Sequence, residues 1–223
     1  MKHDAAHRFW VCMTVLAGLA GLLYSSWPLG YLLNPSASKK GLASALEALN
    51  QPYNWVFITG DVLSGLIILI TGWLIWRRYR ASVHYGHLLS LILINWSIFA
   101  LGTIADALLP EHCLPGAASC PSWHQDHILF AHGILSILAA AGLFAVLLLI
   151  WWRNRNLLFY GLILGYSVFA LLSLYEALNP AQGNFSQHYY LTLCGLWIAL
   201  IPYAIHRTFF AGEPESSGKK STP

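Results

Sequence analysis

The residues of this sequence that could do chemistry stand out because most of the chain is apolar. Only 9% of its 223 residues are Asp, Glu, Lys or Arg, against about 25% in a typical soluble protein. Within long apolar segments, charged groups are costly and usually face the bundle interior or a water-filled cavity. These segments or their ends hold eight candidates for a polar site: Asp61, Ser64, Asp106, His127, His132, Ser136, Glu176 and His188.

A site of this kind could bind a lipid headgroup or another small molecule from the cell envelope, for transfer or for sensing. It needs only a polar cavity within a helix bundle. Asp61 and His132 are its central candidates, because they lie deeper within apolar segments than the other charged residues. We expect alanine at either position to abolish such a function without loss of the protein.

Zinc chemistry is an alternative, in the form of a zinc-dependent membrane lipid hydrolase. Such enzymes hold zinc through three protein ligands and leave a position for an activated water. His132, His188 and Asp106 are the metal candidates, with His127 or Glu176 as further ligands. The sequence contains no compact motif such as His-Glu-x-x-His, so zinc is the secondary hypothesis.

A haem-binding electron carrier is a third hypothesis, because membrane haems are held by histidines on facing helices. His132 with His188 would provide one such pair, and His87 with His206 another.

An accessory membrane subunit is a fourth hypothesis. Small residues at close spacing permit close contacts between membrane helices. Gly18 and Gly21 form one such pair, and Gly161 and Gly165 another. The oligomeric state does not follow from the sequence.

Six long apolar segments must position these residues. Each is long enough to cross a bilayer, which takes roughly 20 residues in a helix. They are too long, and too rich in Leu, Ala and Gly, for the strands of an outer-membrane barrel. We therefore predict an all-α bundle of six transmembrane helices over residues 1–210 and a disordered cytoplasmic tail over 211–223. The segments cover residues 9–33, 54–76, 85–109, 128–152, 157–178 and 189–209.

The distribution of Lys and Arg predicts the orientation, since cytoplasmic loops carry the excess of both. One set of loops and termini holds ten of the twelve, and the other set holds only Lys39 and Lys40. Both termini are therefore predicted in the cytoplasm of a multi-pass protein of the cell (inner) membrane. The net charge of +3 reflects this bias, so the lipid bilayer is the expected partner and nucleic acid is not.

The loop between the third and fourth segments would then face outward, where disulfides persist. Cys113 and Cys120 are predicted to form a disulfide, although their spacing also allows a Cys/His metal site. Ser122 and Gln125 fit a capping box, which predicts that the fourth helix starts there.

Two segments of the sequence resemble each other. "WSIFALGTIADALLP" at 96–110 and "YSVFALLSLYEALNP" at 166–180 share seven of fifteen residues. The match aligns Asp106 with Glu176, each four residues before a proline. We interpret this as a duplicated helical hairpin, 54–109 and 128–178. Chance similarity between two Leu/Ala-rich helices is the alternative.

Helical periodicity gives each segment a polar stripe, and the stripes are most polar at their outer ends. Asp61, Asp106, His132, Glu176 and His188 are therefore predicted to share one cavity, open outward and closed at mid-membrane. The alternative is that these residues are helix ends that reach water.

A family resemblance adds to this interpretation. The segments "DALLPEHCLPGAASC", "HGILS" and "SQHYYLTLCGLWIAL", with an acid near the end of 157–178, resemble the prokaryotic membrane family known as domain of unknown function 998. The resemblance implies a six-helix fold and brings no activity with it. Its markers map onto Asp106, Pro110, Cys113, Cys120 and His132. Gln187-His188 stands where the family pattern has Gln-Arg.

A weaker likeness is to membrane hydrolases that include the alkaline ceramidases. They hold zinc through Ser, Asp and His near one membrane face, and Asp61, Ser64, Asp106 and His132 are similar in type. Those enzymes have a His-x-x-x-His pair in their last helix, where this chain has only His188.

Overall fold

The fold is known from a computed structural model, which describes residues 2–36, 43–80, 86–113, 126–179 and 185–210. These residues form helices and contain no strand, and six of the helical spans are long and apolar enough to cross a membrane. The prediction of an all-α fold with six membrane helices is confirmed. Its elements are α1 (Lys2–Tyr24), η1 (Trp27–Leu29), α2 (Gly30–Leu33), η2 (Ala43–Glu47), α4 (Asn54–Tyr79), α5 (Gly86–Ala107), α6 (His127–Asn154), α7 (Leu157–Leu178) and α8 (Phe185–Phe209).

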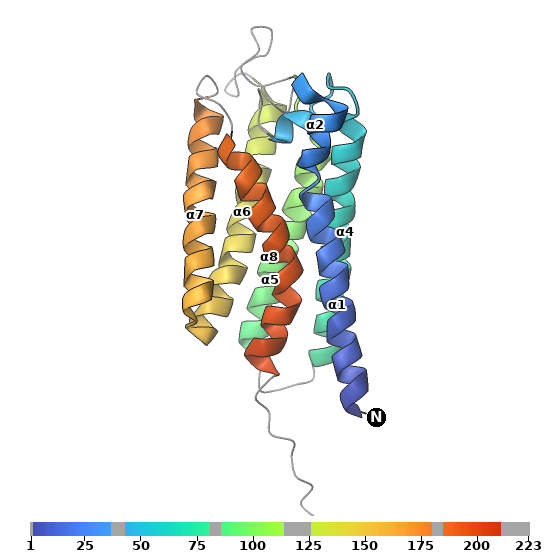
Figure 1. Cartoon of the computed structure of the whole chain (residues 1–223), viewed down its shortest axis with the longest axis vertical. Coiled ribbons are helices and arrows are strands. Elements are labelled where there is room, and N and C mark those ends of the chain that lie inside the picture. The colour runs from blue at the N-terminus through green and yellow to red at the C-terminus, as the bar shows by residue number, and fades with distance from the viewer. Residues whose placement is uncertain (1, 37–42, 81–85, 114–125, 180–184, 211–223) are drawn as a thin grey trace, which may run out of the picture.

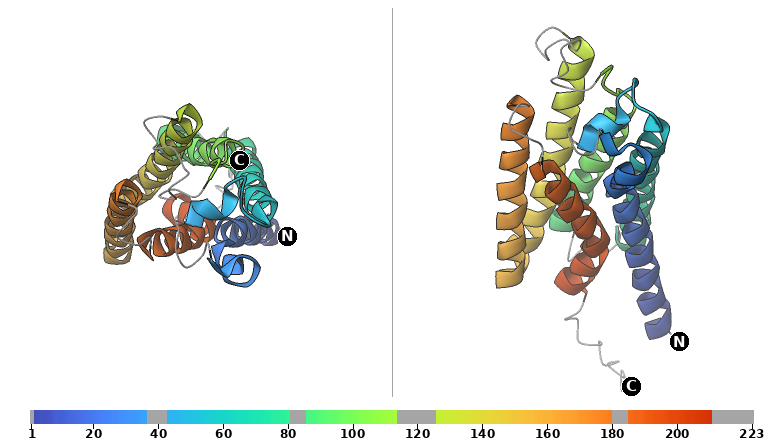
Figure 2. Two further views of the ribbon diagram at one scale, coloured as in Figure 1. Left: turned by 90° about the horizontal axis from the view of Figure 1, so that it is seen from above. Right: turned by 45° about the horizontal axis from the view of Figure 1, so that its top comes forward.

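The long helices run up and down (Figure 1), and seen from above they form a ring in chain order (Figure 2). Each packs against the next along the chain, and α8 returns to pack against α1 (Figure 2). The start of α1 and the end of α8 lie at the same end of the bundle, as an even number of spans requires. Which end faces the cytoplasm stays a prediction.

The first predicted segment, 9–33, is not a single helix. Helix α1 ends at Tyr24, and the short η1 and α2 follow. Pro28 explains the break, because its ring would clash with the carbonyl of Tyr24 four residues earlier in a continuous helix. The chain thereby reaches the upper end of the bundle as short turns, which lie near η2 (Figure 2).

The start of α6 also differs from the prediction. The helix begins at His127, and its N-cap is Asp126, whose carboxylate accepts hydrogen bonds from the amides of Ile128 and Leu129. The helix therefore starts later than Ser122, and the capping box predicted on Ser122 and Gln125 lies outside the described residues. Asp satisfies the free amides of a helix start as well as Ser does.

Close backbone contact joins the first and last long helices. A Cβ atom at Gly195 of α8 would lie 2.6 Å from the carbonyl oxygen of Gly21 on α1 and would collide with the Ser25 hydroxyl. Ser25 in turn donates to the carbonyl of Leu191, at 3.1 Å. Gly21 therefore serves packing within the chain. At Gly161 and Gly165 on α7 an added Cβ would meet nothing within 4 Å.

The end of the bundle that holds the termini carries the basic turns. Arg guanidinium groups lie over aromatic rings there, as with Arg78 over Phe9 at 4.5 Å and Arg155 over Trp152 at 5.0 Å. Such an arginine–aromatic girdle is typical of a membrane interface. The acids of the candidate site lie at the opposite end.

Three predicted features lie outside the described residues. These are the tail 211–223, Cys120 and the Ser122–Gln125 segment. Cys113 is the last described residue before the 114–125 gap, so the disulfide stays a prediction. Within the helices, Cys194 is buried in α8 and Cys12 is exposed on α1.

Candidate functional site

Three helices and one short turn meet at the end of the bundle away from the termini. Asp106 lies in the last turn of α5, and His132 and Ser136 lie in the first turns of the antiparallel α6. Asp61 lies in the second turn of α4, and Glu47 ends the η2 turn. Residues on different elements, separated by 14 to 89 positions, are thus brought together by the fold.

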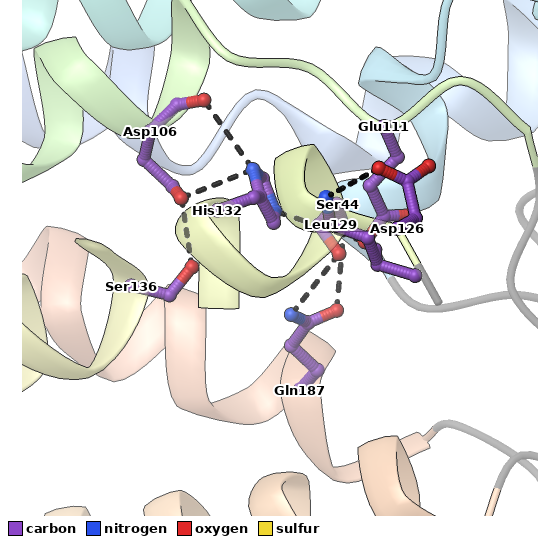
Figure 3. A network of polar contacts seen from close by, with 8 residues as sticks. All are labelled: Ser44, Asp106, Glu111, Asp126, Leu129, His132, Ser136 and Gln187. Carbon is purple, nitrogen blue, oxygen red and sulfur yellow. Dashed lines mark hydrogen bonds and ion pairs between the residues drawn. The ribbon is translucent and has the colours of Figure 1, made fainter. Parts of the chain in front are cut away.

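Asp106 and α6 form the best-defined contact of the site (Figure 3). His132 Nδ1 lies 3.0 Å from Asp106 Oδ1 and 3.3 Å from the Asp106 carbonyl oxygen. Ser136 Oγ donates to Asp106 Oδ2 at 2.9 Å. His132 and Ser136 face the same side because they are four residues apart in one helix. Asp106 therefore fixes both side chains against the end of α5.

Glu111, in the segment after α5, lies near the second ring nitrogen of His132. Its Oε1 lies 3.7 Å from His132 Nε2, and the residue is only 5% exposed. Its carbonyl accepts from the amide of Leu49 at 2.8 Å, which ties this segment to the residues after η2. Burial raises the pKa of Glu111 to about 7, against the opposing effect of His132. The carboxyl thus titrates near neutral pH.

Glu47 and Asp61 form a carboxyl pair between η2 and α4. Both side chains line the same cavity, and η2 packs on α4. Burial, reinforced by the charge of Asp106, raises the pKa of Glu47 to about 7. The Glu47 carboxyl therefore titrates near neutral pH.

A cavity of about 80 Å³ lies between these groups. This is room for several water-sized groups. Its polar lining includes three acids, four hydroxyl side chains of Ser or Thr and one amide, and four of its lining residues are aromatic. The lining residues are Tyr24, Ser26, Trp27, Ala43, Ser44, Glu47, Phe57, Asp61, Thr103, Asp106, Ser136, Ala139, Gln187, Tyr190 and Leu191.

The η2 turn covers one side of the cavity and is held to α8. Gln187 Oε1 accepts from the Ser44 amide at 3.3 Å, and Gln187 Nε2 donates to Ser44 Oγ at 3.5 Å (Figure 3). Ala43, Ala45, Leu46 and Glu47 are all buried. The cavity is therefore bounded by a folded turn.

Four of the eight predicted site residues do not line this cavity or contact Asp106. Ser64 donates to the carbonyl of Ala20 at 2.9 Å and joins α4 to α1. His188 is buried with its ring 4.5 Å from that of Trp27. His127 is exposed at the start of α6. Glu176 accepts from the amide and the hydroxyl of Ser186, at 2.9 and 2.8 Å, and so caps the start of α8.

The zinc candidates are correspondingly separated. Asp106 contacts His132, but His188 packs on Trp27 and Glu176 on Ser186. Across the described ranges, no three His, Cys, Asp or Glu side chains lie close enough together to ligate one metal ion.

Two acids of the site, Glu47 and Glu111, are absent from the sequence-based set. Both lie outside the six apolar segments, where an acidic residue is ordinary and does not by itself indicate a site. A sequence signal for Glu47 does exist. "EALN" occurs at 47–50 and again at 176–179, and "DALL" at 106–109 is similar. Three acids followed by Ala-Leu thus lie near the same end of the bundle.

These features define a polytopic all-α membrane protein with a cavity at one end whose lining includes three acids. The family model described as "Protein of unknown function (DUF998)" matches residues 15–211, and the chain belongs to this family. The resemblance drawn from the sequence is therefore confirmed. Comparison with curated proteins finds no match, and comparison with solved structures finds none.

Proposed function

We propose that the protein binds a lipid headgroup or another small polar molecule of the cell envelope in the cavity beneath η2. The observation that carries the proposal is the meeting of Glu47, Asp61 and Asp106 around one cavity of about 80 Å³. Buried carboxyls are costly within a membrane domain and are typical of a ligand or ion path. Packing alone would favour apolar residues there.

The proposed orientation places this cavity at the outer face of the cell membrane. The arginine-rich turns at the other end favour the cytoplasm. A ligand would then reach the site from outside or from the outer leaflet. Transfer and sensing both fit such a site, and both begin with binding.

A zinc-dependent lipid hydrolase is less well supported. Its proposed ligands would have to converge, whereas His188 and Glu176 have partners elsewhere. Haem binding by His132 with His188 has the same difficulty, and His132 has acids near both ring nitrogens.

The test is to identify what the purified protein retains. The full chain would be extracted into native-lipid nanodiscs, and bound lipids and small molecules would be measured by mass spectrometry. Ser44→Phe would fill the cavity from the η2 side. Ser36→Phe is the matched control, because Ser36 is exposed and does not line the cavity.

The expected result is a molecule enriched with the wild type and with Ser36→Phe, and lost with Ser44→Phe. If all three proteins retained the same molecules in the same amounts, the cavity would not be the binding site.

A further inference from the structure

The charged residues around the cavity favour a cationic ligand. Glu47, Asp61 and Asp106 line it, and no Lys, Arg or His is among the described lining residues. His132 contacts Asp106 but does not itself line the cavity. A bound anion would meet three carboxyl groups without a compensating base, whereas a cation would be paired.

The rest of the lining favours an organic cation over a metal ion. Metal ions such as Mg²⁺ and Ca²⁺ require converging oxygen ligands, and the described residues offer no such cluster. The cavity instead has aromatic side chains on its walls: Tyr24, Trp27, Phe57 and Tyr190. Aromatic faces with nearby carboxylates are the chemistry that recognises alkylammonium groups.

The aromatic walls are held in place by hydrogen bonds. Trp27 Nε1 donates to Thr192 Oγ1 at 3.2 Å. The Tyr190 and Tyr166 hydroxyls lie 2.8 Å apart, and the Tyr166 hydroxyl also donates to the carbonyl of Ala140 at 2.9 Å. Rings held in this way lose little further freedom when a ligand binds, which favours affinity.

The carboxyl groups can accept hydrogen bonds from an ammonium group. Asp61 and Asp106 both line the cavity. Asp106 Oδ2 accepts one hydrogen bond, from Ser136, and a carboxylate oxygen can accept a second.

The cavity size limits what part of a molecule can enter. About 80 Å³ admits several water-sized groups, which suits an ammonium head and excludes an acyl chain. Building on the function proposed above, we infer that the cavity binds the ammonium group of an alkylamine between Asp61, Asp106 and the Trp27 and Tyr190 rings. A lipid headgroup and a free amine share this chemistry.

The inference is tested with the full chain in nanodiscs made only of phosphatidylglycerol, which contains no amine. Ethanolamine and choline are the probes, and 3,3-dimethylbutan-1-ol is the neutral isostere of choline. Binding is measured by calorimetry. We expect both cations to bind and the neutral isostere to bind at least about tenfold more weakly, since a buried carboxylate distinguishes the charge.

Asp61→Asn and Asp106→Asn should each weaken cation binding by about tenfold or more. Glu176→Gln is the matched control, because Glu176 occupies the equivalent repeat position but caps α8, and it should change binding by less than about twofold. Trp27→Leu should weaken choline binding several-fold through loss of the aromatic face. The unfolding midpoint of each variant would be measured. Because two amide variants are tested, the inference remains testable if one of them does not fold.

Equal binding of choline and its neutral isostere, or unchanged binding in both amide variants, would overturn the ammonium inference and leave the proposed cavity function standing. If the protein retained and bound no molecule of any kind, the ammonium inference and the proposed cavity function would both be overturned. Repeating the ethanolamine titration in phosphatidylethanolamine nanodiscs separates the sources. Weaker apparent binding there assigns the lipid headgroup, and unchanged binding assigns a free amine.

Discussion

Asp106 and Glu176 occupy matching positions in two similar segments but lie in different surroundings. Each accepts a hydrogen bond from a serine on the following helix, Ser136 for Asp106 and Ser186 for Glu176. Asp106 also contacts His132 and lines the cavity, whereas Glu176 does neither.

The difference comes from what covers each helix end. α5 lies between α4 and α6 in the ring, and η2, which packs on α4, lines the same cavity as Asp106. α7 packs less extensively on its neighbours, and much of its surface is exposed. The same local motif therefore makes a helix-joining contact in both places, and it becomes a candidate chemical site only where neighbouring elements bury it.

The largest expected effect is on the Asp106 side of this comparison. Asp106→Ala would remove the carboxylate that pairs with the buried His132 and that accepts from Ser136, which costs about 2–4 kcal/mol of the free energy of unfolding. Glu176→Ala should cost about 1 kcal/mol, as for a lost helix cap. Unfolding in mixed detergent measures both. Equal losses would mean that burial does not distinguish the two acids.

The next largest effect concerns helix packing, which is close between α1 and α8 and looser around α7. Gly195→Ala would force α1 and α8 apart, because its Cβ overlaps Gly21 and Ser25, and we expect a loss of about 1–3 kcal/mol. Gly165→Ala on α7 meets nothing within 4 Å and should stabilise by a few tenths to about 1 kcal/mol through helix propensity. A destabilising Gly165→Ala would indicate that the outer face of α7 is covered.

The acids at and near the cavity should make the stability of the protein depend on pH. Glu47 and Glu111 both have a pKa raised to about 7, so the folded state holds protons that the unfolded chain releases near 4.5. The free energy of unfolding should therefore fall as the pH rises from about 4.5 to about 7, on the order of 1–3 kcal/mol. The groups that set this slope, besides the two glutamates, are Asp61, Asp106 and His132.

Glu111→Gln should flatten that dependence, because the amide does not titrate. Denaturant unfolding at pH 5 and pH 7.5 checks the difference. A slope identical to that of the wild type would show that Glu111 is not the titrating group.

The smallest expected effect concerns the two serines. Ser136→Ala removes a hydroxyl donor to Asp106 and should cost about 1–2 kcal/mol at this part-buried site. Ser186→Ala should cost less than about 1 kcal/mol, because the Ser186 amide still donates to Glu176. A larger loss at Ser186 would reverse the comparison.

The membrane architecture was predictable because segment length and apolarity determine whether a helix can span a bilayer. The Asp106–Ser136 contact also follows in part from sequence. Helical spacing puts His132 and Ser136 on one face, and consecutive membrane helices run antiparallel, which brings the start of α6 to the level of the end of α5.

The rest of the site was not predictable. Residue spacing predicts which side chains share a helix face, but it does not predict which element packs against that face. His188 and Glu176 lie on polar stripes, yet they contact Trp27 and Ser186. Glu47 is brought to Asp61 by a turn outside the apolar segments, and its position depends on how η2 packs against α4 and α8.

The most direct test of the cavity account compares Asp106→Asn with Glu176→Gln in the retention experiment. Both replace one carboxyl with its amide at matching positions of the two segments. The account predicts that the molecule retained by the wild type is lost from Asp106→Asn and kept by Glu176→Gln. Retention by Asp106→Asn at the wild-type level, or equal loss from both variants, would contradict it.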